Sequence, residues 1–161
     1  GMTADAWQTP PTNNRPVDLT FEYDGNPTFS NPSTNTLPPA AADIDKLVSV
    51  RGETNLVVVR QAYETFFARF PQPPQAPDLA KSYADLAYRF HKLLLSGGEW
   101  KQAAELLRLV LKTPSLERST YRQVEMELSE LDVWLAEHSS GTERQKYLDE
   151  AKSYLENRMW H

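Results

Sequence analysis

The sequence contains few residues whose types and spacing could support catalysis or metal binding. Its three histidines, His91, His138 and His161, are too far apart to form a metal-binding pair on one turn of a helix. The chain has no cysteine, which excludes disulfides, a thiol nucleophile and thiolate zinc sites. Gly97-Gly98 is not followed by the Lys-Ser or Lys-Thr of a phosphate-binding loop. We therefore expect no enzymatic activity, no catalytic residue, no cofactor and no bound metal.

Carboxylates gather in one segment, which contains Glu125, Glu127, Glu130 and Asp132. They alternate with apolar positions, as on the solvated face of an amphipathic helix, and this pattern does not require a catalytic role. A helical-bundle enzyme or small-molecule binder, with a site around His91, stays open as an alternative of a different class.

Composition indicates a globular protein with little affinity for polyanions. The chain has 161 residues, of which 40% are hydrophobic and 24% charged, and its formal net charge is -5. A chain of this size fits one domain, or one domain with an appendage. The acidic balance shows no basic stripe, so we expect no nucleic acid and no anionic membrane as partner.

The N-terminal residues and the lengths of the apolar runs predict where in the cell the protein is located. No run approaches the roughly 18 apolar residues of a membrane span, and the N-terminus lacks the basic and apolar regions of a signal peptide. Gly1 before Met2 is typical of the remnant of a cleaved tag. If Met2 is the natural start, we expect a soluble, cytoplasmic protein.

Two regions differ in character, and we predict an N-terminal arm over 1–42 and a helical domain over 43–161. The arm is rich in proline, asparagine and threonine, and its prolines forbid a continuous helix. Apolar and polar residues alternate from Val17 to Tyr23, and Asp24-Gly25-Asn26 then predicts a turn. With Thr28-Phe29 as a short return strand, the arm would carry a small β-hairpin.

Two interpretations of this arm stay open. Its composition is that of a disordered tail. Alternatively, it packs as an extended arm through the anchors Trp7, Phe21, Tyr23 and Phe29, on its own helices or on a neighbouring copy. The second interpretation allows a homo-oligomer that forms through the arm.

After residue 42 the hydrophobic spacing predicts six helices. We expect them over 43–48, from an N-cap at Thr54 to Phe70, from an N-cap at Asp78 to Leu95, and over 99–112, about 115–137, and from a capping box at Thr142 and Gln145 onward. The expected apolar faces carry Val58, Ala62 and Phe66 on the second helix, Val124, Leu128, Leu131 and Leu135 on the fifth, and Leu148, Ala151, Leu155 and Met159 on the sixth. The predicted fold class is all-α, with antiparallel helix pairs.

The segment from Tyr83 to Pro114 resembles a tetratricopeptide repeat. Tyr83, Leu86, Ala87 and Phe90 occupy the aromatic, large apolar, small and aromatic positions of the first helix. Gly98-Glu99-Trp100 resembles the family's turn, and the second helix follows with Ala103 and Leu107. The first helix is about one turn longer than the repeat's standard, and the resemblance covers only part of the chain. It implies a short stack of helix pairs.

In that family the first helix of each pair lines a groove that binds a peptide or a partner helix. Carried over to this sequence, the resemblance selects Ala84 and the candidate groove residues Lys81, Asp85, Tyr88, His91 and Lys92. The alternative is an ordinary solvated helix face. We therefore expect an adaptor or chaperone-like scaffold whose partner is another protein or a peptide. The second hypothesis is a structural subunit that assembles through its arm.

Overall fold

The computed structural model describes residues 37–160, with side chains as far as Glu156. These residues form helices and contain no strand, so the predicted all-α class is confirmed for this part of the chain. In order, the elements are α2 (Ala41–Val48), the 3-10 helix η2 (Ser49–Gly52), α3 (Leu56–Arg69), α4 (Pro77–Ser96), α5 (Trp100–Lys112), α6 (Arg118–Glu137) and α7 (Gly141–Trp160). The predicted hairpin and the anchors Trp7, Phe21, Tyr23 and Phe29 lie outside the described residues.

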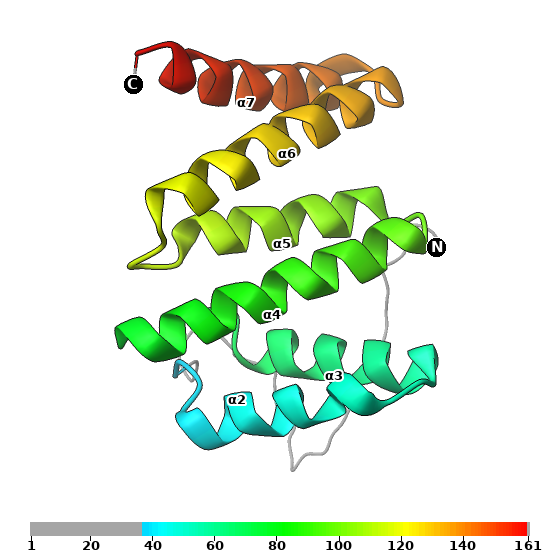
Figure 1. Ribbon diagram of the computed structural model, residues 1–161. Helices are drawn as coiled ribbons and strands as arrows, with labels where there is room; N and C mark the ends of the chain where they lie inside the picture. The colour runs from blue at the N-terminus through cyan, green and yellow to red at the C-terminus, as the bar shows by residue number, and fades with distance from the viewer. Residues whose placement is uncertain (1–36, 161) are drawn as a thin grey trace. The chain divides into compact units, whose positions relative to one another are not determined.

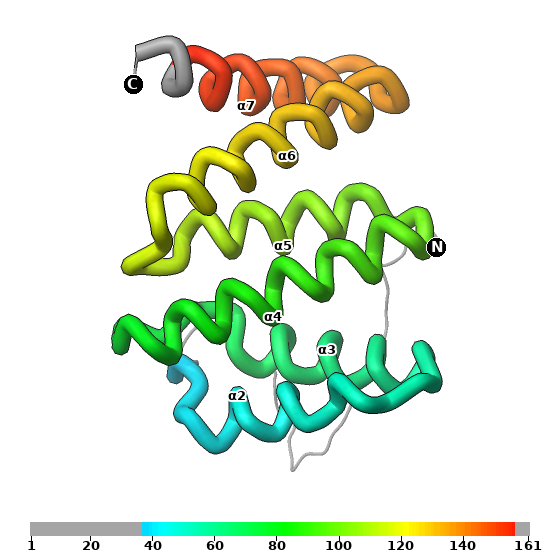
Figure 2. Tube along the Cα trace, viewed as in Figure 1, coloured from blue at the N-terminus to red at the C-terminus, as the bar shows by residue number. Residues whose placement is uncertain are grey.

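Consecutive helices run antiparallel and are joined by short turns (Figures 1 and 2). Along the chain, α4 packs on α5, α5 on α6, and α6 on α7, while α2 and α3 pack on each other and both on α4. They belong to one compact unit that begins at Pro38. In the part of the chain that the structure describes, no helix is long and apolar enough to span a bilayer.

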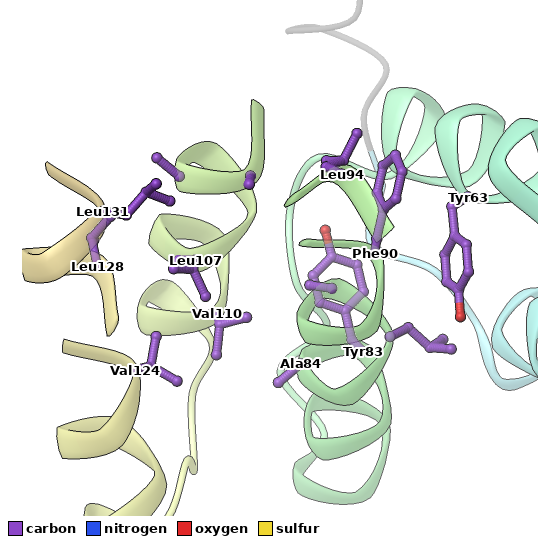
Figure 3. Close-up of a cluster of buried hydrophobic side chains, with 14 of the residues drawn as sticks. Tyr63, Tyr83, Ala84, Phe90, Leu94, Leu107, Val110, Val124, Leu128 and Leu131 are labelled. Atoms are coloured by element: carbon purple, nitrogen blue, oxygen red, sulfur yellow. The ribbon is translucent and has the colours of Figure 1, made fainter. Parts of the chain in front are cut away.

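The core follows the sequence pattern most closely in α4, α5 and α6. Leu107 and Val110 of α5 and Val124 and Leu128 of α6 are almost completely buried, as is Tyr83 of α4. Figure 3 shows this cluster, with Tyr63 of α3 beside Phe90 of α4 at its other end. The predicted stripe of α6, Val124, Leu128, Leu131 and Leu135, is buried throughout.

Small residues let α4 and α5 approach closely. Ala87, Ala103 and Ala104 have no exposed surface, and all lie in the segment that resembles a repeat. A larger side chain at such a contact would have to displace its neighbours, because protein interiors are close-packed.

Several helices begin at residues other than those predicted, because the local capping residues determine where each helix starts. The N-cap of α3 is Asn55, whose side chain accepts a hydrogen bond from the Val57 amide, so the prediction of Thr54 was wrong by one residue. The N-cap of α4 is Ala76, followed by proline at the first helical position, which places Asp78 inside the first turn.

The last two helices also depart from the predicted starts. Helix α6 begins at Arg118, because Ser115 adopts a left-handed conformation with φ of 64° and Pro114 lies in the turn before the helix. Helix α7 begins at Gly141, so Thr142 lies within the first turn and not at the N-cap.

Two predicted apolar faces are buried only in part. In α3, the predicted Phe66 is buried and Ala62 packs against the core, whereas Val58 is 44% exposed and the buried Tyr63 was not predicted. In α7, the predicted Ala151 is buried and Leu148 packs against the core, whereas Leu155 is 47% exposed, and the side chain of Met159 lies outside the described residues. The neighbouring helices select which face is buried, and a short amphipathic pattern leaves that choice open.

Candidate functional site

The candidate groove residues lie on the exposed side of α4. Lys81, Asp85, Tyr88 and Lys92 recur at intervals of three or four residues, and this spacing places them on one face of a helix. Lys81, Asp85 and Lys92 are exposed and Tyr88 is half-buried, while His91 is 2% exposed and Ala84 is also buried. The face therefore presents four of the predicted residues, and His91 supports it from beneath.

Asp85 is engaged within the protein. Its carboxylate Oδ2 accepts from Arg51 Nη2 of η2 at 2.8 Å and from Arg89 Nε of α4 at 2.9 Å. Both partners are exposed, so the pairs are weak, but they orient the carboxylate and hold η2 beside α4. We infer that Asp85 organises this end of the face.

Tyr88 connects α4 to α6. Its hydroxyl lies 2.8 Å from both carboxylate oxygens of Glu127, to which Gln123 also donates. Burial and the hydrogen bond to Glu127 raise the pKa of Tyr88 to about 12, so the phenol stays neutral and keeps donating at ordinary pH. This hydrogen bond fixes the Tyr88 ring as one wall of the site.

His91 is a packing residue. Its Nδ1 lies 2.5 Å from the Tyr88 carbonyl oxygen, and its ring centroid is 4.5 Å from that of Tyr88. A carbonyl can only accept, so Nδ1 carries the proton. Burial lowers the pKa of His91 despite this hydrogen bond, and the ring is therefore neutral at pH 7.

A hollow opens to solvent at the C-terminal half of α4, with a volume of about 540 Å³. Its lining comes from α4, from the start of α5 and from α6, and consists of Tyr88, His91, Lys92, Leu95, Ser96, Trp100 and Glu127. Lys92 Nζ lies 5.5 Å from the centre of the Tyr88 ring, within the range of a cation–π contact. The structure thus brings Tyr88, His91 and Lys92 together and leaves Lys81 and Asp85 outside the hollow.

Trp100 is held in place by a second aromatic contact. Its ring lies 4.7 Å from that of Trp134, which stacks on His138 at 3.8 Å between centroids. His138 caps the C-terminus of α6, where its Nδ1 lies 2.9 Å from the Trp134 carbonyl oxygen. The pre-positioned indole gives the hollow a rigid apolar wall.

Sequence reasoning did not place Trp100, Leu95 or Glu127 in the site. The position of Trp100 in the turn after Gly97-Gly98 was the only available signal. Glu127 joins through its hydrogen bond from Tyr88, 39 residues away, which no local pattern reveals.

The hollow offers groups for reversible binding. It combines aromatic surface with one exposed ammonium, one carboxylate and the two hydroxyls of Tyr88 and Ser96. Among the described residues, no group of three or more histidine, aspartate or glutamate side chains could hold a metal ion. Comparisons with protein-family models, with curated proteins and with solved structures found no match to this chain.

Proposed function

We propose that this protein is an interaction module that binds a peptide or a partner helix of another protein on the exposed face of α4. The observation that carries this proposal is the hollow at Lys92 and Trp100, which has rigid aromatic walls and an exposed cation. Aromatic walls bind chain segments at low entropic cost, because their rings are already immobilised. No covalent chemistry is required, and the module would act as an adaptor or scaffold.

The connections between helices support a tetratricopeptide-like stack. Arg51 to Asp85 links η2 to α4, and Tyr88 to Glu127 links α4 to α6. A separate series links the second helices: the Arg60–Glu99 ion pair joins α3 to the start of α5, and Lys101 to Glu143 joins α5 to α7. Side-chain links thus run from η2 to α4 and from α4 to α6, and separately from α3 to α5 and from α5 to α7, an order that favours stacked pairs.

The spacing of these links departs from a regular array. The two residues of each link are 34 apart for Arg51 and Asp85, 39 apart for Tyr88 and Glu127, and 42 apart for Lys101 and Glu143. A tetratricopeptide unit has about 34 residues. The added length matches the 20-residue helices α4, α6 and α7 and favours an irregular, tetratricopeptide-like stack.

Selection of peptides on the full chain tests the proposal. Peptides from a displayed random library would be selected on the wild-type protein, and their affinities measured by fluorescence anisotropy. We expect Lys92→Glu and Trp100→Ala each to weaken binding at least tenfold, whereas Lys152→Glu on the exposed side of α7 leaves it unchanged. If no peptide is selected, or if all three variants bind alike, the α4 face is not the binding surface.

A second candidate function is a structural subunit that self-assembles. Its predicted anchors lie outside the described residues, but Leu56, Val57 and Val58 at the start of α3 are 64%, 69% and 44% exposed. Consecutive exposed apolar residues favour a contact surface. Light scattering on the full chain would detect an oligomer that Val57→Glu or Trp7→Ala dissociates, and a monomer at all concentrations would exclude this candidate.

A further inference from the structure

Asp132 is the most deeply buried charged side chain of the described unit, and nothing in the binding site uses it. It lies on α6 with no exposed surface, between α5 and α7. The charged and titratable groups around it are Arg108 and Glu105 of α5, and Lys146, Tyr147, Glu150 and Tyr154 of α7.

One arginine serves three carboxylates in this cluster. Arg108 donates to Glu150 from Nε at 3.0 Å and from Nη2 at 2.8 Å, and its Nη1 lies 3.1 Å from Glu105. Its contact with Asp132 Oδ1 is the longest, at 3.4 Å. A single guanidinium cannot neutralise three ionised carboxylates, and two of them, Asp132 and Glu150, are mostly shielded from water.

Asp132 Oδ2 accepts no hydrogen bond. A buried carboxylate oxygen without a donor is costly, but a protonated carboxyl can itself donate, here to Glu150. Burial and the nearby Glu150 carboxylate raise the pKa of Asp132 to about 8. Burial disfavours the Glu150 charge, yet hydrogen bonds from Arg108 and Asp132 outweigh it and lower the pKa of Glu150. Because Asp132 has no exposed surface and only the longest contact to Arg108, whereas Glu150 receives the close ones, Asp132 is the carboxyl that retains a proton.

Helix α7 is the last helix of the described unit, packs along α6, and reaches α5 through the partners of Lys101 and Arg108. Its Tyr147 and Ala151 are buried, and Leu148 and Tyr154 are partly buried against the core. The Lys101–Glu143 pair is solvent-exposed and contributes little. The interactions of Glu150 with Arg108 and Asp132 are therefore the part of the α7 contact that changes when Asp132 ionises.

We propose that α7 is a pH-dependent latch, which docks with uptake of one proton by Asp132 and opens locally as the pH rises while α2 to α6 stay folded. Opening hydrates Asp132, whose carboxyl then ionises with an ordinary acidic pKa. Because the docked state binds the extra proton, a rise in pH favours the open state. Arg108 keeps its charge between pH 5 and 8, and Tyr147 and Tyr154 stay neutral, since burial raises their pKa values. One released proton corresponds to a tenfold increase in the opening constant per pH unit in this window.

Hydrogen exchange of the full chain at pH 5.5, 6.5 and 7.5, corrected for the intrinsic pH dependence, measures this constant. We expect opening of amides 145–156 to increase about 100-fold over the two pH units, while the amides of α4 keep their protection. Asp132→Asn should abolish the pH dependence, because an amide donates to Glu150 without a titrating proton. The control Glu143→Gln removes only the exposed Lys101–Glu143 ion pair, and α7 opening in this variant should keep the pH dependence of the wild type.

The proposal is wrong if wild-type α7 shows no such slope, if Asp132→Asn retains it, or if α7 opens only together with α4. An Asp132→Asn variant that fails to fold does not remove the test. The carboxyl carbon of Asp132 in the wild-type protein can be titrated by nuclear magnetic resonance, and a midpoint near 4 would equally overturn the latch.

Discussion

The hydroxyl of Tyr83 makes a buried hydrogen bond whose removal is a sharp test of how α3 and α4 are joined. Tyr83 has no exposed surface, and its hydroxyl donates to the carbonyl oxygen of Phe70 at 2.5 Å. Phe70 is the C-cap of α3 and precedes proline, so its carbonyl has no helical partner. Burial raises the pKa of Tyr83, which keeps the hydroxyl protonated and donating at any practical pH.

Tyr83→Phe removes this donor and leaves the ring. The ring contacts with Phe66 and Phe67, at 6.0 Å and 5.3 Å between centroids, should persist. A buried acceptor that loses its only strong donor costs about 1–3 kcal/mol. Against a typical total stability of about 5–15 kcal/mol, we expect a loss of about 1–2 kcal/mol.

Urea unfolding followed by circular dichroism measures the effect, as a lower midpoint with an unchanged slope. Tyr121→Phe, at a tyrosine that is 38% exposed, is the matched control and should change stability by less than about 0.5 kcal/mol. A Tyr83→Phe protein as stable as wild type would refute the reasoning, because the Phe70 carbonyl would then be satisfied in another way.

Three further changes test packing, backbone and charge. Ala103→Leu adds volume where α4 and α5 meet and should destabilise by about 1–3 kcal/mol in urea, and a neutral result would show that the two helices can separate. Gly98→Ala should cost about 1–2 kcal/mol because φ is 77° there, whereas Gly52→Ala, in open space, should be neutral or slightly stabilising by the same assay. Asp132→Asn should raise the urea midpoint at pH 8 by more than at pH 5, because the wild type loses the stabilising proton as the pH rises, and an equal shift at both pH values would contradict this.

Hydrophobic spacing alone determined the helices of the C-terminal two-thirds and one complete buried face. Val124, Leu128, Leu131 and Leu135 repeat over three turns, which suffices to define the core side of α6. The resemblance to a tetratricopeptide repeat likewise placed the small residues Ala87 and Ala103 where α4 and α5 meet, and both are fully buried. Such signals come from residues that are close in the sequence, so they can be interpreted without knowing which helices pack against each other.

The exact ends of the helices, and the buried face of α7, depend on tertiary contacts that the hydrophobic pattern of the sequence does not encode. Asn55 caps α3 one residue after the predicted Thr54, since adjacent polar residues compete for the same role. The N-cap of α4, Ala76, lies two residues before the predicted Asp78, because Pro77 suits the first helical position. In α7 the buried side is chosen by α5 and α6, and Leu155 remains in solvent although it fits the apolar stripe.

The candidate site, too, was predicted in part from the sequence and in part defined only by the tertiary structure. The resemblance to a tetratricopeptide repeat selected Tyr88, His91 and Lys92, and all three line the hollow. Only the tertiary structure brought Glu127 to Tyr88 and made Trp100 a wall of the hollow. It alone also buried Asp132 beside Glu150, since the linear sequence shows an ordinary acidic helix face and only packing removes the water that would keep both carboxylates charged.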